Sequence, residues 1–106
     1  MTEAGHHDVF SAIADPTRRQ VLGLLAGGER SVTALAGHFT VTRPAVSKHL
    51  AILREAGLVT ERKIGRERRY RLHAGPLQEV RDWTSHFERF WSEKLNALQK
   101  HLEEES

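Results

Sequence analysis

Residues 31–57 have the sequence SVTALAGHFTVTRPAVSKHLAILREAG. Apolar side chains recur at helical spacing in both halves of this segment: Val32, Leu35, Ala36 and Phe39, and then Val46, Leu50 and Leu53. Ser31 is suited to cap the first helix, and Gly57 is suited to end the second in a left-handed conformation. Only Thr40 and Val41 separate the two patterns. Two short helices joined by so tight a turn indicate a helix-turn-helix over residues 31–57.

The second of these helices is predicted from Thr42 or Arg43 to Ala56. Pro44 leaves the first residue open, because the residue before a proline avoids the helical conformation. In a helix-turn-helix, this second helix presents its outer face to a groove of nucleic acid.

Two more helices are predicted upstream of this motif. Residues 7–14 have apolar side chains at helical spacing. Asp15-Pro16 then starts a second helix, because aspartate can cap the first turn and a proline at the first helical position loses no hydrogen bond. Gly27-Gly28 ends it.

The pattern changes after Gly57, where residues 58–64 and 69–72 are predicted to be two strands around a turn at 65–68. The hairpin is strongly basic, and Glu67 is the single acid between residues 62 and 71. Its basic residues are Arg62, Lys63, Arg66, Arg68, Arg69 and Arg71. A helix-turn-helix followed by such a hairpin, here about residues 58–73, is the winged variant. The predicted fold class is therefore mainly α with a small β-hairpin.

Charge is distributed unevenly along the chain. Residues 31–75 contain nine arginines and lysines but three glutamates, whereas residues 1–30 and 76–106 each carry a net negative charge. A basic middle between acidic ends is typical of a surface that binds a polyanion. From charge alone, a charged surface that only contacts solvent is as good an explanation as a surface that binds a polyanion. The basic hairpin favours the second explanation, with nucleic acid as the polyanion.

A long helix is predicted over about residues 76–104, starting at Gly75-Pro76. Apolar residues recur along it at steps of three and four, over roughly 29 residues or about 43 Å. This apolar face is longer than so small a domain can cover, so we expect a second copy of the same helix to cover it in a two-fold dimer. The alternative is a helix that folds wholly back on the first helix. The expected dimer interface consists of Phe10, Leu77, Val80, Phe87, Trp91, Leu95 and Leu98.

The composition excludes several classes of protein. The 106 residues predict a single domain, 1–106, and the absence of cysteine excludes disulfides, thiol nucleophiles and metal sites built on thiolates. No segment approaches the roughly 18 apolar residues that a membrane span needs. We expect a soluble cytoplasmic protein, associated with the nucleoid and with no membrane partner.

Three ordered motifs resemble the ArsR-type winged helix-turn-helix repressors. They are ADPTRRQVLGLL at residues 14–25, PAVSKHLAILREAGLV at 44–59 and IGRERRY at 64–70. The resemblance extends over roughly residues 8–100. It implies a homodimeric repressor that binds a palindromic operator in double-stranded DNA and releases it on an inducing signal.

The resemblance also implies which residues contact DNA. The contacts expected from the exposed N-terminal face of the second helix of the motif are Thr42, Arg43, Pro44, Ser47, Lys48 and His49. Those expected from the wing are Arg62, Lys63, Arg66 and Arg68. Arg43 is suited to donate two hydrogen bonds to O6 and N7 of a guanine, whereas Pro44 offers only apolar contact.

One departure from the family bears on the inducer. Metal-sensing members carry a cysteine-containing motif where this chain has LAGHF, residues 35–39. A metal-sensing repressor with a site on the terminal helices is the alternative, and its candidate ligands are Asp82, His86, His101 and Glu104. Exposed polar residues on an amphipathic helix explain these four more simply. The sequence therefore predicts no metal and no cofactor, and leaves the inducer unidentified.

No enzymatic arrangement is predicted. No nucleophile lies in a strained elbow, and no glycine-rich loop is placed to hold a phosphate. A second alternative is a protein-interaction module that uses the winged fold without nucleic acid, which the basic hairpin disfavours.

Overall fold

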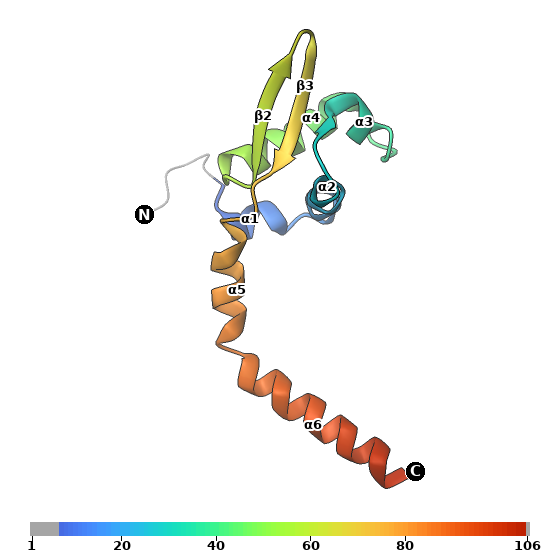
Figure 1. Ribbon diagram of the computed structural model, residues 1–106, viewed down its shortest axis with the longest axis vertical. Coiled ribbons are helices and arrows are strands. Elements are labelled where there is room, and N and C mark those ends of the chain that lie inside the picture. The colour runs from blue at the N-terminus through green and yellow to red at the C-terminus, as the bar shows by residue number, and fades with distance from the viewer. Residues whose placement is uncertain (1–6, 106) are drawn as a thin grey trace.

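The computed structural model describes residues 7–105, so the predicted single domain of 1–106 includes residues outside the described range. The elements follow one another along the described chain as shown in Figure 1: α1 (Val9–Ile13), α2 (Pro16–Ala26), β1 (Arg30–Ser31), α3 (Val32–Ala36), α4 (Arg43–Glu55), β2 (Val59–Ile64), β3 (Glu67–Leu72), α5 (Leu77–Ser85) and α6 (Glu88–Glu105). A mainly helical chain with a small antiparallel sheet confirms the predicted fold class.

Side-chain caps start the helices where the sequence predicts them. Asp15 accepts a hydrogen bond of 2.9 Å from the backbone N–H of Arg18 at the start of α2. The hydroxyls of Ser31 and Thr42 accept in the same way at the starts of α3 and α4. Because each cap satisfies an N–H that the helix itself leaves free, it defines the first turn locally.

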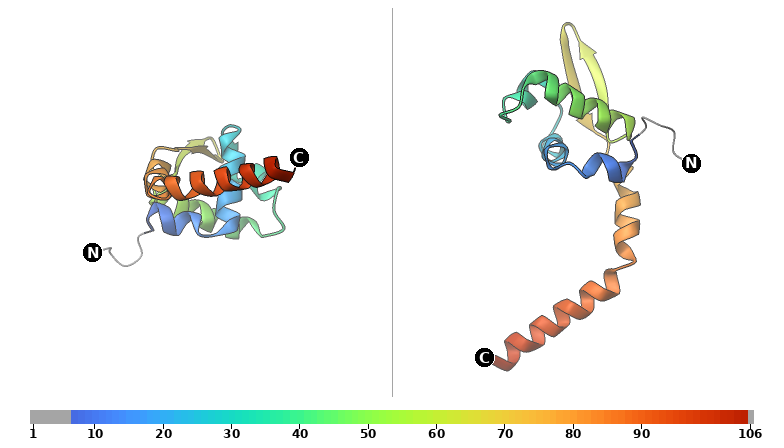
Figure 2. Two further views of the ribbon diagram at one scale, coloured as in Figure 1. Left: turned by 90° about the horizontal axis from the view of Figure 1, so that it is seen from below. Right: turned by 180° about the vertical axis from the view of Figure 1, so that it is seen from behind.

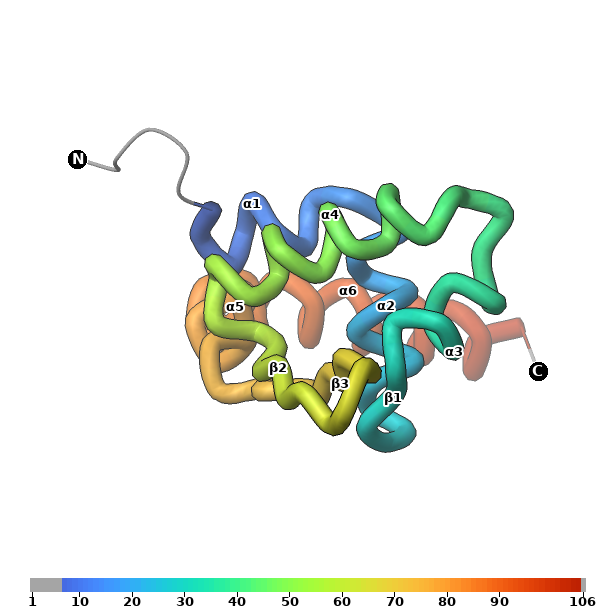
Figure 3. The backbone as a smooth tube through the Cα atoms, turned by 90° about the horizontal axis from the view of Figure 1, so that it is seen from above, coloured from blue at the N-terminus to red at the C-terminus, as the bar shows by residue number. Residues whose placement is uncertain are grey.

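An apolar core holds the helix-turn-helix together. Leu35 of α3 and Leu50 and Leu53 of α4 are completely buried, and Tyr70 of β3 is buried with them. Seen from above in Figure 3, α4 lies over α1 and α2, and the hairpin β2–β3 stands beside it. The outer side of α4 and the hairpin therefore share one face of the molecule.

The sheet differs from its prediction in two respects. Its strand order is β1-β3-β2, all antiparallel, and β1, which the sequence does not predict, pairs Arg30 with Tyr70. A strand of two residues is too short to show an alternating pattern. The four-residue turn at 65–68 is wrong, because Glu67 pairs with Ile64 and Gly65-Arg66 alone form the turn. Gly65 has a φ of 60°, which favours glycine.

The single C-terminal helix predicted over 76–104 is also wrong, since it is broken between α5 and α6. At the break the backbone N–H groups of His86 and Phe87 donate to carbonyls three residues earlier, and so do the hydroxyls of Thr84 and Ser85. Hydroxyls that bond to nearby carbonyls in this way compete with the helical ladder. The apolar periodicity continues through the break, which is why the sequence pattern does not reveal it.

The two C-terminal helices leave the rest of the molecule on the side opposite the hairpin. We call residues 9–72 the winged domain. α5 follows β3 in the chain and starts beside α1, and α6 then changes direction and extends away from the winged domain (Figures 1 and 2). The molecule is accordingly elongated, with principal extents of 62 × 38 × 21 Å. Within residues 7–105, no helix has the length and apolar character that crossing a membrane requires.

Candidate nucleic-acid interface

The outer side of α4 carries most of the predicted contacts on this helix. Arg43, Pro44, Ser47 and Lys48 are exposed, whereas Val46 points into the core. Thr42 is exposed too, but its hydroxyl caps the helix. The structure thus presents the N-terminal turn of α4 with its basic and hydroxyl side chains uncovered.

His49 does not lie with this group. Its Nδ1 is 3.4 Å from Nη1 of Arg18 and 3.9 Å from a carboxylate oxygen of Asp15, so the ring packs against α2. The hydrogen bond from the backbone of Arg18, with the charges of His49 and Arg18, holds the pKa of Asp15 below its usual value. His49 thus joins α4 to α2 in this structure and does not share the exposed side of α4 with Arg43, Ser47 and Lys48.

Strand alternation divides the basic hairpin between two sides. Arg62 is paired across the strands with Arg69, and both contact the carboxylate of Glu29, at 2.8 Å and 3.5 Å. Lys63 is paired with Arg68 and lies on the other side, which faces α4. Successive side chains of a strand point to opposite faces. The predicted wing set is therefore not brought together, because Arg62 lies on the side of Glu29.

Glu29 partly neutralises the charge on the side of the hairpin that carries Arg62 and Arg69. The hydrogen bonds from Arg62, together with the charges of Arg62 and Arg69, hold the pKa of the Glu29 carboxyl below its usual value. A carboxylate kept ionised beside two guanidiniums reduces the positive potential that these residues offer to a polyanion.

The predicted basic residues on the α4 side are brought together. Arg43 from the start of α4 and Arg66 and Arg68 from the hairpin line one hollow of about 280 Å³, with Thr33 of α3 on its wall. Ion pairs are found for Arg68 and not for Arg43 or Arg66 within residues 7–105. The N-terminal turn of α4 and the tip of the wing thus form one continuous surface, on which three arginines outnumber a single acid, Glu67.

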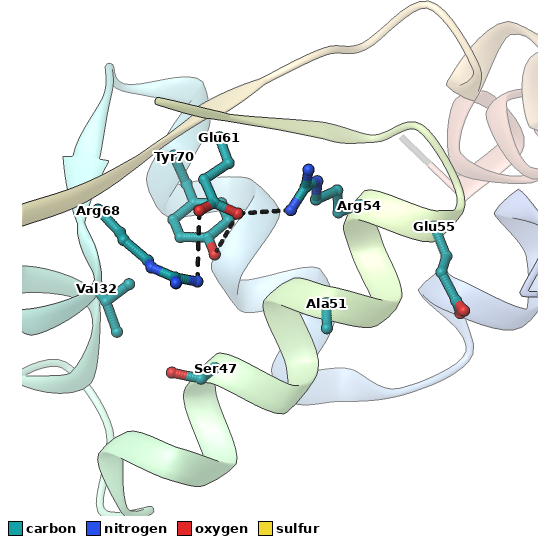
Figure 4. Close-up of a pocket in the computed structure, with 8 residues that line it drawn as sticks. All are labelled: Val32, Ser47, Ala51, Arg54, Glu55, Glu61, Arg68 and Tyr70. Carbon is teal, nitrogen blue, oxygen red and sulfur yellow. Dashed lines mark hydrogen bonds and ion pairs between the residues drawn. The ribbon is translucent and has the colours of Figure 1, made fainter. Parts of the chain in front are cut away.

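A second hollow of about 460 Å³ lies between α4 and the hairpin, with Ser47, Ala51 and Arg54 on its α4 wall (Figure 4). Glu61 lies on the opposite wall and accepts a hydrogen bond of 2.7 Å from Nη1 of Arg54. The hydroxyl of Tyr70 also donates to Glu61, at 3.3 Å. Burial raises the pKa of Tyr70, and the Glu61 charge adds to this shift.

Sequence reasoning missed Arg54 and Glu61 as parts of this surface. A signal was nevertheless present. Ser47, Ala51 and Arg54 recur at intervals of four and three, which places them on one face of a helix. The partner of Arg54 is not visible in that pattern, because it belongs to another element.

The predicted dimer residues fall into two groups. Phe10, Leu77 and Val80 pack against the core of the winged domain, and the ring of Phe10 meets that of Trp83 at a centroid distance of 5.9 Å. The remaining predicted residues are uncovered, with exposed fractions from 46% to 65%: Phe87, Trp91, Leu95 and Leu98. Phe87 lies just before α6 and the other three lie along it. None of them lines either of the two hollows between α4 and the hairpin.

The candidate metal ligands are not brought together. Nδ1 of His86 lies 3.1 Å from the carbonyl of Trp83, and His101 pairs with Glu105 at 3.0 Å rather than with Glu104. Asp82 belongs to α5, whereas His101 and Glu104 belong to α6. Between residues 7 and 105 no three His, Asp or Glu side chains gather closely enough to hold a metal ion.

Comparison with known proteins gives the same assignment throughout. The family model described as "Bacterial regulatory protein, arsR family" matches residues 15–61. The chain is 38% identical to the transcriptional repressor SdpR of Bacillus subtilis (strain 168), over 76% of this chain and 90% of that protein. It is also 38% identical to the HTH-type transcriptional regulator Rv2034 of Mycobacterium tuberculosis (strain ATCC 25618 / H37Rv), over 91% of this chain and 87% of the other.

Solved structures agree. A crystal structure described as a possible transcriptional regulator for arsenical resistance has a TM-score of 0.69 and 46% identity, and covers 87% of this chain and 93% of its own. The crystal structure of an ArsR family transcriptional regulator has a TM-score of 0.70 and 36% identity, and covers 78% of this chain and 86% of its own.

Proposed function

This chain belongs to the ArsR family of bacterial regulatory proteins and is a DNA-binding transcription regulator, and from that premise we propose that it is a homodimeric repressor of a palindromic operator. Its relatives are regulators of transcription rather than enzymes. The observation that carries the proposal is the continuous surface of Arg43, Arg66 and Arg68, uncovered on the side of the molecule opposite α6.

We assign base readout to α4. Arg43 at its first turn is placed to donate to O6 and N7 of a guanine, and Ser47 and Lys48 follow on the exposed side. Pro44 contributes apolar contact, for example to a thymine methyl group. Thr42 acts by capping the helix that carries these residues.

We assign backbone contact to the wing. Arg66 and Arg68 lie on the side that faces α4, and Lys63 shares the face of Arg68. Such residues bind phosphates or enter the minor groove, and they contribute affinity without reading the sequence. Arg62 is left out of this set, because its guanidinium is bonded to Glu29 on the other side.

The proposed dimer is formed by the C-terminal helices. Phe87, Trp91, Leu95 and Leu98 are large apolar side chains that the chain itself leaves uncovered. A second copy can cover them through a two-fold interface, in which the same surface serves both subunits. The dimer then places two α4 helices in successive major grooves about 34 Å apart. Bound to a promoter, it excludes RNA polymerase.

We propose that release from DNA does not require a metal. The chain has no cysteine, so it lacks the thiolates that arsenic and related soft metals prefer. Imidazole and carboxylate sites for zinc need four ligands at about 2.0–2.2 Å. Asp82 lies on α5, His86 in the break after it, and His101 and Glu104 on α6. The proposed location is the cytoplasm, at the nucleoid, where the operator is.

The experiment that tests this function uses the DNA upstream of the protein's own gene. Footprinting locates a protected site, and fluorescence anisotropy compares that site with a random duplex at several salt concentrations. We expect a symmetric footprint, and a preference for the site of at least about a thousandfold at physiological salt. Equal affinity for both duplexes would contradict sequence-specific repression, and a monomer in sedimentation at working concentration would contradict the dimer.

A further inference from the structure

Three acidic side chains line the two hollows on the face that is proposed to bind DNA: Glu55 and Glu61 the larger hollow, and Glu67 the smaller one. Of these, Glu61 lies between α4 and the hairpin and is held by two arginines. The Glu61 cluster, as we name it, consists of Glu61, Arg54, Arg68 and Tyr70 (Figure 4). Nη1 of Arg54 lies 2.7 Å from Oε2 of Glu61, and Nη1 of Arg68 lies 3.5 Å from Oε1. The two guanidiniums approach the carboxylate from opposite sides, one from α4 and one from β3.

The carboxylate of Glu61 would be costly to leave without a cation at this position. The Glu61 side chain is only 15% exposed, whereas those of Arg54 and Arg68 are 62% and 60% exposed. A carboxylate with little access to water needs a cation and hydrogen-bond donors to offset its lost hydration. We therefore expect Glu61 to keep at least one guanidinium when DNA approaches, and the shorter contact identifies that guanidinium as Arg54.

The cluster changes how many cations this face offers to phosphates. Arg54 lies on the same outer face of α4 as Ser47, one of the proposed base contacts, so a free Arg54 would stand beside the DNA. Arg54, Arg68 and Glu61 together carry one net positive charge, whereas the two arginines alone would carry two. Arg68, which is held at the longer distance, remains for the phosphate backbone.

We propose that Glu61 limits the sequence-independent affinity for DNA, because it retains Arg54 and so removes one phosphate contact per subunit from binding to every duplex. The proposal rests on the DNA-binding function given above. Phosphate contacts strengthen binding to every sequence equally, whereas base contacts distinguish one sequence from another. A carboxylate that limits the former therefore lowers the affinity for all DNA, operator and random alike, and leaves the ratio of the two affinities unchanged.

The test is the salt dependence of binding by E61Q. Glutamine keeps the size of the side chain and an oxygen that accepts from Tyr70, but it lacks the charge that holds Arg54. We expect the slope of log K against log salt to steepen by up to about 0.9 per subunit. This corresponds to about a threefold to fourfold larger loss of affinity between 50 and 200 mM salt. Operator and random DNA are both bound more tightly, and by similar factors.

A matched control is E67Q, which removes the same charge from the same hairpin and from the wall of the smaller hollow, beside Arg66 and Arg68. Glu67 contacts Arg69 at 3.3 Å, and Arg69 keeps Glu29 as a partner when Glu67 is replaced. No arginine is released, so we expect the slope of E67Q to equal that of the unmodified protein. A slope as steep as that of E61Q would mean that overall charge, and not the release of Arg54, is responsible, and would overturn the proposal.

Arg54→Ala tests the proposal without altering Glu61, and it decides the matter if E61Q fails to fold. In the unmodified protein we expect Arg54→Ala to leave the slope unchanged, whereas in E61Q it removes the gain. If Arg54→Ala alone makes the slope as shallow as Arg66→Ala does, Arg54 already contacts phosphate and the proposal is wrong. The same holds if E61Q weakens binding to both duplexes with no change of slope, since Glu61 then acts only in folding.

These outcomes are distinguishable from failure of the proposed function. If the unmodified protein shows no salt-dependent binding to any duplex, the proposed function itself is wrong. If it binds the operator and the E61Q slope matches its own, only the role of Glu61 is wrong.

Discussion

The winged domain and the C-terminal helices differ in how completely the chain covers its own apolar surface. The winged domain buries an apolar core that includes Leu35, Leu50 and Leu53, and its predicted DNA contacts lie outside that core. α5 and α6 have no buried residue, and several of their large apolar side chains, including Trp91 and Leu95, are exposed. One region is therefore complete within a single chain, and the other presents a surface of the kind that a partner covers.

The largest expected effect lies in the core and would sharpen this contrast. Leu50→Ala removes a completely buried side chain that joins α4 to the other helices. We expect it to lower the free energy of unfolding by about 2–5 kcal/mol, because the folded state loses the buried apolar surface and also gains a cavity. Urea denaturation measures this change. Lys48→Ala, on the exposed side of the same helix, is the control and should stay within about 0.5 kcal/mol.

The second prediction concerns the uncovered region. Trp91→Ala combined with Leu95→Ala removes two large apolar side chains from α6, so we expect the dimer to dissociate or to unfold. Sedimentation measures the dissociation, and circular dichroism shows whether the winged domain stays folded. A folded dimer of unchanged stability would place the interface elsewhere and would break the comparison between the two regions.

A third prediction separates base readout from backbone contact. Arg43→Ala should cost about 1–3 kcal/mol on the operator and much less on random DNA, because a bidentate contact to guanine is lost. Anisotropy titrations with both duplexes measure the two losses. Equal losses would make Arg43 a phosphate contact and would assign the specificity to Ser47, Lys48 or the shape of the DNA.

The fourth prediction compares the two sides of the hairpin. Arg66→Ala should make the slope of log K against log salt shallower by up to about 0.9 per subunit, because Arg66 stands free at the turn beside Arg43. Arg62→Ala removes the same charge, but this guanidinium is bonded to Glu29, so we expect a smaller change. If both replacements change the slope equally, the strand faces do not divide the hairpin as we infer.

The last prediction is that adding or removing metal ions does not change the affinity for the operator. Operator affinity should be the same in the presence of a chelator and of micromolar zinc, nickel or cobalt, because no three His, Asp or Glu side chains between residues 7 and 105 gather closely enough to hold a metal ion. Gel shifts at fixed protein concentration measure it. A tenfold or greater loss with one metal, abolished by His86→Ala, would restore the metal-sensor alternative.

The parts of the fold that follow from neighbouring residues could be predicted. The caps at Asp15, Ser31 and Thr42 each join residues three positions apart, and the apolar stripe of α4 repeats within one or two turns. Such interactions are contained in a short window of sequence. The same holds for the glycine at position 65, whose left-handed backbone the turn requires. These local signals were enough to predict the winged helix-turn-helix and the residues at the start of α4.

What local patterns could not supply is the choice of partners between distant elements. Arg62 is bonded to Glu29, 33 positions away, and Arg54 to Glu61 on another element. A list of six basic residues therefore could not show which guanidiniums are neutralised and which face DNA. The break at residues 86–87 and the two residues of β1 likewise leave the apolar periodicity unchanged. Composition and periodicity establish which elements form, whereas the pairing of charges depends on which elements the core brings side by side, since ion pairs act only over a few ångströms.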